Sequence, residues 1–365
     1  MRLAAEGPVR FASASSLPTC GASTGGVVMD PGRIMQVGVG FAMSKALLSA
    51  VELGVFTDLA SQPATADELG ERLGLHERGR QDFFDLLLAL GMLEREGDGP
   101  GAKYSNGADC DMFLDRNKPT YMGGILEMFN DRLYPFWAGL TEGLRTGLPQ
   151  NEVKHTGKSM FEGLYADPAR LEQFMLAMAG ISAGNFHALA SQFDFSRYGS
   201  VIDVGGATGL LSTILAQHHP HLQCVTCDLP VVAPIAHRAI EAAGVAERVR
   251  TRDLDFFAEP IPSGDVVTMG MILHDWNLEK KMHLIKAAYD ALPAGGAFIA
   301  IENMIDDARR QNVFGLFMSV NMLIEFGDAF DFTGADFTRW CQEVGFNKVE
   351  ILPLAGPASA GIAYK

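Results

Sequence analysis

The stretch that decides the fold is SVIDVGGATGLLSTILAQ, residues 200–217. Val201–Val204 reads as a short apolar strand, which runs into a glycine loop, Gly205–Gly209, and then into an apolar helix, Leu210–Gln217. Glycines let a backbone approach a ligand closely, and a helix N-terminus offers free N–H groups. In a doubly wound α/β sheet this is where the ligand binds.

The sequence of the glycine loop also indicates which kind of nucleotide cofactor it can bind. Dinucleotide binding favours G-x-G-x-x-G, but Ala207 and Leu210 occupy the second and third glycine positions. The glycine loop does not continue into the Gly-Lys-Ser/Thr triplet that a phosphate-binding P-loop requires. Asp228 follows the next predicted strand, where a carboxylate can accept both hydroxyls of a ribose. Asp203–Gly209 is therefore more typical of S-adenosylmethionine (SAM) enzymes.

Downstream of the loop, predicted strands alternate with helices, which predicts a doubly wound and mostly parallel sheet. Only a Gly-Pro turn, Gly356-Pro357, joins the last two strands, so we expect them to form an antiparallel hairpin. The expected strands are Cys224–Cys227, Val249–Arg252, Val266–Met269, Ala297–Ile301, Lys348–Leu352 and Gly361–Tyr364.

The N-terminal part has a different pattern. Residues 1–28 are rich in Ser, Gly and Ala, so we expect a disordered extension. Apolar periodicity then predicts a helix from Pro31 to Leu59, and Thr65 and Glu68 form a capping-box pattern that opens the next helix. A third helix and a hairpin over residues 92–105 complete a winged-helix order. Capping signals also start helices at Ser159-Met160-Phe161-Glu162 and at Asp167-Pro168.

Composition argues against nucleic-acid and membrane partners. The 365 residues carry 29 Lys+Arg and 44 Asp+Glu, a net charge of −15, whereas phosphate contact needs a basic surface. The predicted recognition helix, His76–Leu90, mixes its arginines with acidic residues. An uninterrupted apolar run of about 18 residues, the length of a spanning helix, is also missing. Five scattered cysteines favour a reducing cytoplasm.

The pentapeptide Ile272-Leu273-His274-Asp275-Trp276 makes the pattern specific. It closely resembles the signature of the caffeate- and acetylserotonin-type small-molecule O-methyltransferases, which include bacterial antibiotic-tailoring enzymes. The resemblance covers residues 30–365. It implies a class I SAM methyltransferase fold over residues 191–365, a helical substrate-pocket region over 111–190, and a winged-helix-like domain over 29–110 that forms a homodimer.

The resemblance also implies which residues hold the cofactor. The expected contacts come from the glycine loop, the ribose acid, the adenine segment and a serine at the methionine end: Asp203, Gly205, Gly206, Gly209, Asp228, Leu229, Asp255, Phe256 and Ser182. Two positions depart from the family pattern. Leu254 stands where a glycine is usual, and Gly270 stands where a basic residue often contacts SAM.

His274 is the predicted general base. Methyl transfer to a hydroxyl needs the proton removed, and a histidine does this near neutral pH, typically contributing ~10²–10⁴-fold. It follows the strand Val266–Met269, which should place it at the ligand-binding edge of the sheet. By resemblance, Glu302 and Asp331 orient the imidazole, although Asp331 stands where glutamate is usual.

The acceptor pocket is expected to be rich in methionine and phenylalanine. By motif match its lining is Met128, Phe129, Phe174, Met178, Met271, Met322 and Phe326, with Arg132 as a partner for an acidic acceptor. The plant enzymes often carry Trp at the position of Met271 and Asn at that of Phe326, so this aromatic clamp differs.

Three functions stay open at this point. The first is O-methylation of a small hydroxylated molecule. The second is S-methylation of a small thioether acid, which needs no base. In the third, the protein binds SAM but transfers no methyl group. We expect no metal: His218, His219, His221, Cys224 and Cys227 resemble a zinc cluster in composition, but the cysteines lie three apart on a strand and should face opposite ways.

Overall fold

The computed structural model describes residues 30–157 and 160–365. The described residues 30–43 belong to one compact unit, and Ser44–Lys365 form a second. The predicted disordered extension, residues 1–28, and Ser159 of the predicted capping box lie outside the described residues. The first unit holds helix α1 (Gly32–Gly38) and the start of α2 (Gly40–Glu52).

One helical stretch of the described chain, Gly32–Glu52, is long and apolar enough to cross a membrane by length and composition alone. This differs from the expectation based on uninterrupted apolar runs, because glycines and single polar residues interrupt the stretch without making it polar. Such a helix near an N-terminus is weak support for a membrane span. The absence of a membrane partner stays a prediction.

The predicted single helix from Pro31 to Leu59 was wrong. The chain forms three shorter helices there, and the last break is at Gly54, whose φ of +75° belongs to the left-handed region that favours glycine. The order helix, helix, helix, hairpin is confirmed, as is the capping box between Thr65 and Glu68. The elements are α3 (Val55–Ser61), α4 (Ala66–Arg72), α5 (Glu77–Ala89), β1 (Leu93–Glu96), β2 (Lys103–Asn106) and α6 (Ala108–Leu114).

Helices make up most of the region that was predicted to be helical, residues 111–190, but residues 115–122 and 147–151 are loops. A π-helix, η1 (Phe129–Leu133), interrupts this series, and such insertions are frequent at functional sites. The long helix α12 (Pro168–Gln192) begins at the predicted proline, where Asp167 Oδ1 accepts a hydrogen bond from Arg170 N–H. The others are α7 (Gly123–Met128), α8 (Tyr134–Trp137), α9 (Leu140–Thr146), α10 (Glu152–Thr156) and α11 (Met160–Tyr165).

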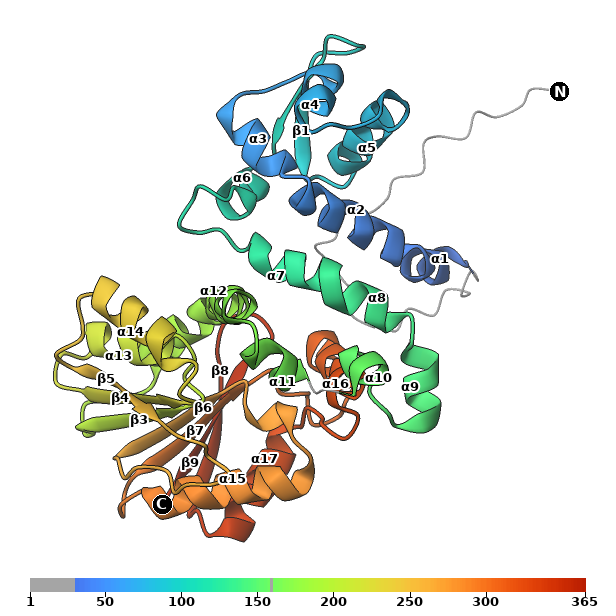
Figure 1. Ribbon diagram of the computed structural model, residues 1–365. Coiled ribbons are helices and arrows are strands. Elements are labelled where there is room, and N and C mark those ends of the chain that lie inside the picture. The colour runs from blue at the N-terminus through green and yellow to red at the C-terminus, as the bar shows by residue number, and fades with distance from the viewer. Residues whose placement is uncertain (1–29, 158–159) are drawn as a thin grey trace, which may run out of the picture. The chain divides into compact units, whose positions relative to one another are not determined.

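The predicted doubly wound sheet is confirmed (Figure 1). Its seven strands have the order β5-β4-β3-β6-β7-β9-β8, and β9 runs antiparallel to both its neighbours. The final strands therefore form the expected hairpin. The strands are β3 (Ser200–Val204), β4 (Gln223–Asp228), β5 (Val249–Asp253), β6 (Val266–Gly270), β7 (Ala297–Glu302), β8 (Lys348–Pro353) and β9 (Ser359–Tyr364).

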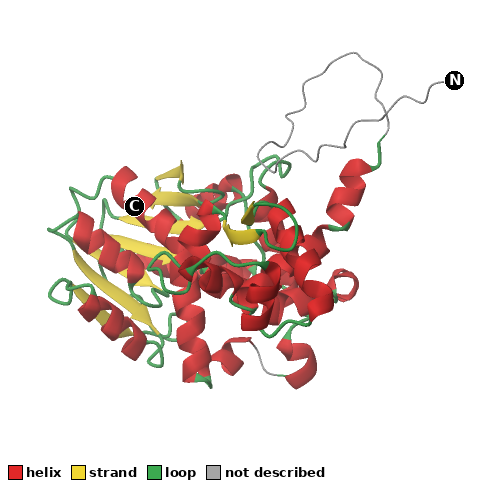
Figure 2. Ribbon diagram, turned by 90° about the horizontal axis from the view of Figure 1, so that it is seen from above, coloured by secondary structure: helices red, strands yellow, loops and turns green. Residues whose placement is uncertain are grey.

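Helices cover both faces of this sheet (Figure 1 and Figure 2). One buried cluster joins α12, α13 (Leu210–His218) and α14 (Ala233–Ala242) to the sheet, and the other joins α15 (Leu278–Ala291) and α17 (Gly334–Val344). Cys224 belongs to the first cluster and Cys227 to the second, so they face opposite ways as predicted. Because β3, β4, β6 and β7 are parallel, their carboxyl ends meet at one edge.

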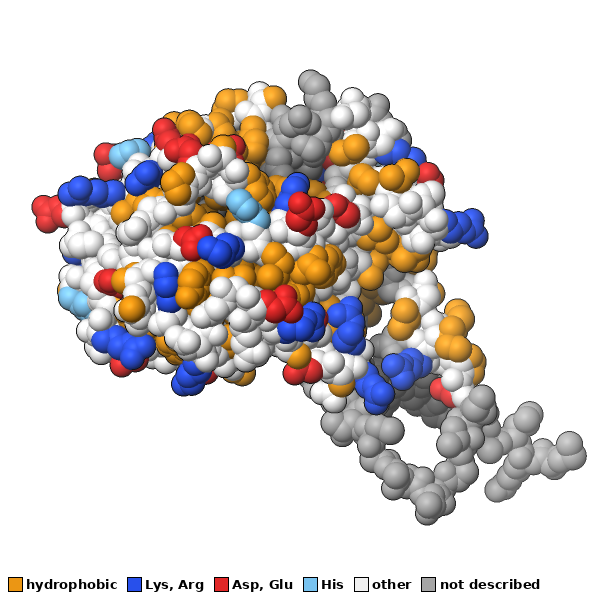
Figure 3. All heavy atoms as spheres, turned by 90° about the horizontal axis from the view of Figure 1, so that it is seen from below, with side chains coloured by type: hydrophobic (Ala, Val, Ile, Leu, Met, Phe, Trp, Pro, Cys, Tyr) orange, Lys and Arg blue, Asp and Glu red, His pale blue; other side chains and the backbone are white. Residues whose placement is uncertain are grey.

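The charged side chains on the face drawn in Figure 3 are mixed in sign. Lysine and arginine side chains lie among aspartates and glutamates there, and they do not gather into one basic band. A nucleic-acid footprint would need such a band. The view supports the expectation drawn from the net charge for this face.

Candidate active site

The glycine loop, Gly205–Gly209, leaves a space for a ligand, which we call the cradle. Side chains at its glycine positions would occupy that space. Gly205 and Gly209 have φ values of +68° and +73°, which favour glycine. A Cβ on Gly206 would lie 2.1 Å from Thr226 Oγ1, so no side chain fits there without movement. Ala207 adopts a left-handed φ of +49° although it is not glycine, a strained conformation of the kind that clusters at functional sites.

Asp228 closes the cradle from the end of β4. Its two carboxylate oxygens accept hydrogen bonds from Ala207 N–H, at 2.9 Å, and from Leu229 N–H, at 2.8 Å. Burial raises the pKa of this carboxyl, while both backbone donors oppose the rise. Each oxygen keeps a further lone pair, so the carboxylate can still accept the hydroxyls of a ribose.

The predicted adenine segment lies beside the same loop. Phe256 and Ile272 are the side chains nearest to the space above Gly205. Asp255 uses one carboxylate oxygen to accept Phe257 N–H, at 3.0 Å. Leu254 is buried, and its N–H donates to the Asp228 carbonyl, so this departure from the family pattern fills the core without entering the cradle.

Asp203 lies below the cradle. It is 2% exposed, and it accepts hydrogen bonds from Thr268 Oγ1, at 2.8 Å, and from Ser212 Oγ, at 3.3 Å. Burial raises its pKa to about 7. A carboxylate buried among these partners supports the loop, and a direct contact with a cofactor is not needed to explain it.

Tyr165, at the end of α11, belongs to this site although its sequence context did not predict it. Its hydroxyl is close enough to Asp228 and Asp275 that both carboxylates, after burial, raise its pKa. It packs with Phe174 and Ala207 against a buried cluster that includes Val232. Tyr165 therefore lies between the ribose acid and the catalytic loop, a position that no local sequence signal reveals.

Ser182 lies on α12 one helical turn before Phe186. The Phe186 ring would be 3.4 Å from a Cβ on Gly270, so this ring occupies the space beside the position where relatives often carry a basic residue. Positions four apart share one helix face, so Ser182 is directed to the same side. Its contact with a cofactor stays a prediction.

His274 lies in a short 3-10 turn, η2 (Leu273–Asp275), after β6. Its imidazole is buried between two carboxylates: Nδ1 is 3.6 Å from Asp331 Oδ1, and Nε2 is 3.3 Å from Asp275 Oδ1. Asp331 is therefore placed as predicted, although it stands farther than a normal hydrogen bond. Asp275 was missed as a partner even though it is part of the quoted pentapeptide.

Glu302 has a different position from the one expected. Its Oε1 accepts the N–H groups of Ile272, at 3.3 Å, and of Leu273, at 2.9 Å. It therefore holds the backbone turn that carries His274, and it acts on the imidazole through charge. Met271 precedes this turn with a strained φ of +55°, and its N–H donates to the Ile301 carbonyl.

The buried charges interact strongly. Burial alone would lower the pKa of His274, but Asp275, Glu302 and Asp331 outweigh it and raise the pKa to about 10. Burial and the neighbouring acids raise the pKa of Glu302 to about 7 and that of Asp275 to about 6, although His274 opposes both shifts. The cluster therefore retains protons that isolated carboxyls would lose.

Several atoms of this cluster have no hydrogen-bond partner among the described residues: His274 Nδ1, Glu302 Oε2 and both oxygens of Asp331. Buried polar atoms without partners are costly, and they mark places where a ligand or water completes the site. The three side chains lie within 4.8 Å of one another, close enough to share a cation as well as a proton. The absence of a metal stays a prediction.

A pocket of about 360 Å³ lies beside α7 and α12. Three predicted acceptor residues line it, namely Met128, Arg132 and Phe174. The others, Phe129, Met178, Met271, Met322 and Phe326, are not among its lining residues, and Met322 is buried in α16 (Val313–Phe326). The structure brings together only part of the predicted acceptor set.

The role predicted for Arg132 needs correction. Its guanidinium makes a two-pronged ion pair with Glu152, at 2.7 and 2.8 Å, and a further contact with Glu325 Oε2, at 3.0 Å. Glu325 is held in turn by Asn151. Arg132 therefore links η1, α10 and α16. Its single positive charge is already paired with two carboxylates, so it is not available to bind an acidic acceptor.

Replacing Arg132 with alanine should lower the free energy of unfolding by about 3–5 kcal/mol, because Glu325 would stay buried without its cationic partner. Denaturant titration measures this change. Arg145→Ala, on an exposed arginine of α9, is the matched control and should change stability by less than about 0.5 kcal/mol. An equal effect of both variants would contradict the structural role of Arg132.

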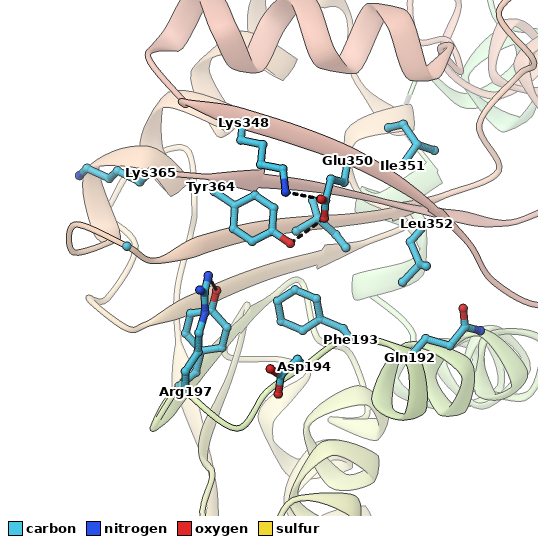
Figure 4. A pocket seen from close by; sticks show the side chains of 13 residues that line it. Gln192, Phe193, Asp194, Arg197, Lys348, Glu350, Ile351, Leu352, Tyr364 and Lys365 are labelled. Atoms are coloured by element: carbon cyan, nitrogen blue, oxygen red, sulfur yellow. Dashed lines mark hydrogen bonds and ion pairs between the residues drawn. The ribbon is translucent and has the colours of Figure 1, made fainter.

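A larger hollow, of about 880 Å³, lies between the end of α12 and the β8–β9 hairpin (Figure 4). Its polar groups are already paired: Glu350 accepts from Tyr364 Oη and pairs with Lys348, and Arg197 donates to Tyr198 Oη. None of the predicted site residues lines it. We therefore place the active site at the glycine loop and η2.

The zinc alternative is not supported by the described contacts. His219 Nε2 lies 2.8 Å from the Ala190 carbonyl, and His221 Nε2 lies 3.1 Å from the Phe195 carbonyl. Both imidazoles thus connect the segment between α13 and β4 to the end of α12 and the residues that follow it. These contacts engage His219 and His221, and Cys224 and Cys227 face opposite ways. The residues that resembled a zinc cluster in the sequence therefore do not converge on one point.

Comparison with known proteins completes the picture. An O-methyltransferase domain model matches residues 137–347, and an O-methyltransferase dimerisation domain model matches residues 35–116. The chain belongs to the O-methyltransferase family. This methyltransferase is 40% identical to the tetracenomycin polyketide synthesis 8-O-methyl transferase TcmO of Streptomyces glaucescens, over 93% of this chain and 98% of the relative.

Two further relatives come from the same genus. The N,N-dimethyltransferase OxyT of Streptomyces rimosus is 36% identical over 86% of this chain and 90% of its own length. The 3-hydroxy-5-methyl-1-naphthoate 3-O-methyltransferase of Streptomyces sahachiroi is 34% identical over 94% and 97%. Among solved structures, human N-acetylserotonin methyltransferase in complex with SAM superposes with a TM-score of 0.85, at 25% identity, over 94% of this chain and 99% of that one.

The cofactor of this methyltransferase is SAM, as the family and the SAM-bound relative establish. The residues present fit it: a loop that excludes side chains, a buried carboxylate with free lone pairs, and an aromatic ring beside them. The predicted contacts of Gly205, Gly206, Gly209, Asp228 and Phe256 therefore lie at one cradle. Their individual roles stay predictions.

Proposed function

We propose that this enzyme methylates a phenolic hydroxyl of a small aromatic molecule of the polyketide or naphthoate type. The observation that carries the proposal is the buried His274 imidazole, set between Asp275 and Asp331 at the sheet edge that also forms the cofactor cradle. Two relatives, one named for tetracenomycin polyketide synthesis and one for 3-O-methylation of a hydroxynaphthoate, support an aromatic acceptor. The methionine and phenylalanine of the α7–α12 pocket suit a flat apolar ring.

The chain's own residues would perform two tasks. The cofactor supplies a methyl group on a positively charged sulfur. The pocket would hold the acceptor in line with that methyl group, and orientation of this kind can supply about 7–11 kcal/mol of the barrier. His274 would take the hydroxyl proton, while Asp331 and Asp275 stabilise the resulting imidazolium. Glu302 would keep the turn in place.

The pKa of His274 leads to a pH prediction. Only the neutral imidazole accepts a proton, and its pKa is raised to about 10, so kcat/KM should rise about tenfold per pH unit across the neutral range. Bound SAM is cationic and disfavours the imidazolium. The plateau of kcat, which reports the complex, should therefore begin at a lower pH than that of kcat/KM for SAM, which reports the free enzyme. Steady-state kinetics over the neutral and alkaline range measure both profiles. A fall in kcat/KM with rising pH would contradict the base assignment.

The acceptor atom is tested with methyl-labelled SAM. The enzyme is incubated with hydroxynaphthoates, polycyclic phenols, aromatic amines and thioether acids, and labelled products are identified by mass spectrometry. A labelled methyl ether is the expected product. A labelled amine, the reaction named for OxyT, or a labelled sulfonium would overturn O-methylation. SAM binding with no transfer to any class of acceptor would favour the non-methylating alternative.

We also propose that the enzyme works as a homodimer in the cytoplasm. The matched dimerisation domain supports self-association, and the few, scattered cysteines support a reducing compartment. Sedimentation of the full chain should give twice the mass of 39.3 kDa. A monomer at all concentrations tested would contradict the dimer.

A further inference from the structure

Lys281 is a lysine with no exposed surface. It lies on α15 six residues beyond the catalytic turn, and its relative exposure is 0%. A buried ammonium is costly unless it is paired and hydrogen-bonded. The mechanism above does not use Lys281, so its burial needs another explanation.

The contacts of Lys281 join separate parts of the active site. Its Nζ donates a hydrogen bond to the Trp276 carbonyl, at the end of the pentapeptide that carries His274. The same atom lies 3.7 Å from the centre of the Phe330 ring and 5.8 Å from that of Phe332. These two rings flank Asp331. One ammonium thus touches both the segment that carries the base and the segment that carries its partner.

The charges around Lys281 come from each element packed against it. Asp275 faces it from η2, Glu302 from the end of β7, and Asp328 and Asp331 from the segment before α17. Burial lowers the pKa of Lys281 to about 8, although these four carboxylates oppose the shift. Three of the acids, Asp275, Glu302 and Asp331, also surround His274.

We propose that Lys281 is a positioning residue of the methyl-transfer site, whose buried ammonium fixes the Trp276 and Asp331 segments and balances the carboxylates that surround His274. The proposal rests on the proposed role of His274 as the base. Without the ammonium, the same carboxylates would be left with His274 as their only cation. The imidazole would then hold its own proton more tightly, and it would remove the hydroxyl proton of the substrate less readily.

The first test is Lys281→Met, which keeps the length of the side chain and removes the charge. In protein carrying ¹³C-labelled histidine, the His274 signal is assigned with a His274→Gln variant and titrated by NMR. Because Lys281 loses its proton at about pH 8, before His274 does, the wild-type His274 signal should show an inflection there, and we expect this inflection to be absent from the variant. Lys286→Met, the same change at an exposed lysine of α15, should leave the titration unchanged.

The second test follows kcat/KM against pH with a hydroxynaphthoate and methyl-labelled SAM. We expect Lys281→Met to lose about tenfold in kcat/KM below about pH 8, where the wild-type Lys281 ammonium is charged, and to approach wild-type activity at higher pH. A loss that is equal at every pH, with an unchanged His274 titration, would mean a merely structural role and would overturn the proposal. Unchanged kinetics and an unchanged titration would overturn it as well.

The two proposals can fail separately. If His274→Ala keeps its activity, or if the hydroxynaphthoate is not methylated, the base assignment or the acceptor class fails, but the NMR titration still tests Lys281. If Lys281→Met does not fold, Lys281→Arg keeps the charge with a different shape. We then expect a reduced kcat and no rise in the His274 midpoint, because the guanidinium stays charged, and a raised midpoint in that variant would overturn the proposal.

Discussion

Replacing His274 with alanine should lower kcat by about 10²–10⁴-fold and leave the dissociation constant of SAM nearly unchanged. The reason is geometric: the imidazole lies between Asp275 and Asp331, whereas the cradle is built from Gly205–Gly209 and Asp228. Losing the imidazole removes proton transfer but not the cofactor contacts. Single-turnover methyl transfer and calorimetric SAM titration measure the two quantities independently.

His283→Ala, an exposed histidine on α15, is the matched control and should keep wild-type turnover. Near-normal turnover of His274→Ala on a confirmed acceptor would show that no base is needed, which is the behaviour expected for a sulfur acceptor. A parallel loss of SAM affinity would instead place His274 in the cofactor site. Circular dichroism of both variants checks that the fold is intact.

Replacing Asp228 with alanine should weaken SAM binding by about 10²–10³-fold, since hydrogen bonds to a charged group contribute about 1.5–3 kcal/mol each. Two effects add. The ribose hydroxyls would lose their acceptor, and the N–H groups of Ala207 and Leu229 would lose the partner that shapes the loop. Calorimetric titration of SAM gives the affinity, and kcat at saturating SAM should change much less.

Asp253→Ala provides the control on the neighbouring strand. Asp253 lies directly opposite Asp228 in the pairing of β4 with β5, but it is exposed. Its loss should leave SAM affinity within about twofold of the wild type, as expected for a surface change. If both variants lose affinity equally, general charge would explain the effect, and the specific role of Asp228 would be wrong.

Much of the fold was predictable because its signals are local. Val201–Val204 followed by Gly205–Gly209 identifies a strand, a tight loop and a helix within a few residues, and each of these is set by nearby backbone preferences. The capping box at Thr65 and the antiparallel hairpin after Lys348 were confirmed for the same reason. The failure at Gly54 was also local: apolar periodicity continued through a residue whose backbone ends the helix.

The active site was predictable only where one motif contains its residues or the resemblance supplies them. His274 and Asp275 are neighbours in the chain, yet only the structure shows that Asp275 faces the imidazole. Glu302 was identified, but its bond to the Leu273 N–H was not. Side-chain direction depends on packing between distant segments, which a linear motif does not encode.

By itself, the sequence predicted a doubly wound sheet with a SAM-type glycine loop, a pentapeptide that carries His274 after a strand, and two cysteines of β4 that face opposite ways. Only the tertiary structure decided that Arg132 is paired with Glu152 and Glu325, that Tyr165 lies beside Asp228, and that Lys281 is buried under the catalytic turn. Backbone conformation follows from neighbours in the chain. The pairing and burial of a charge depend on which distant segments meet it, and that is settled only when the whole chain folds.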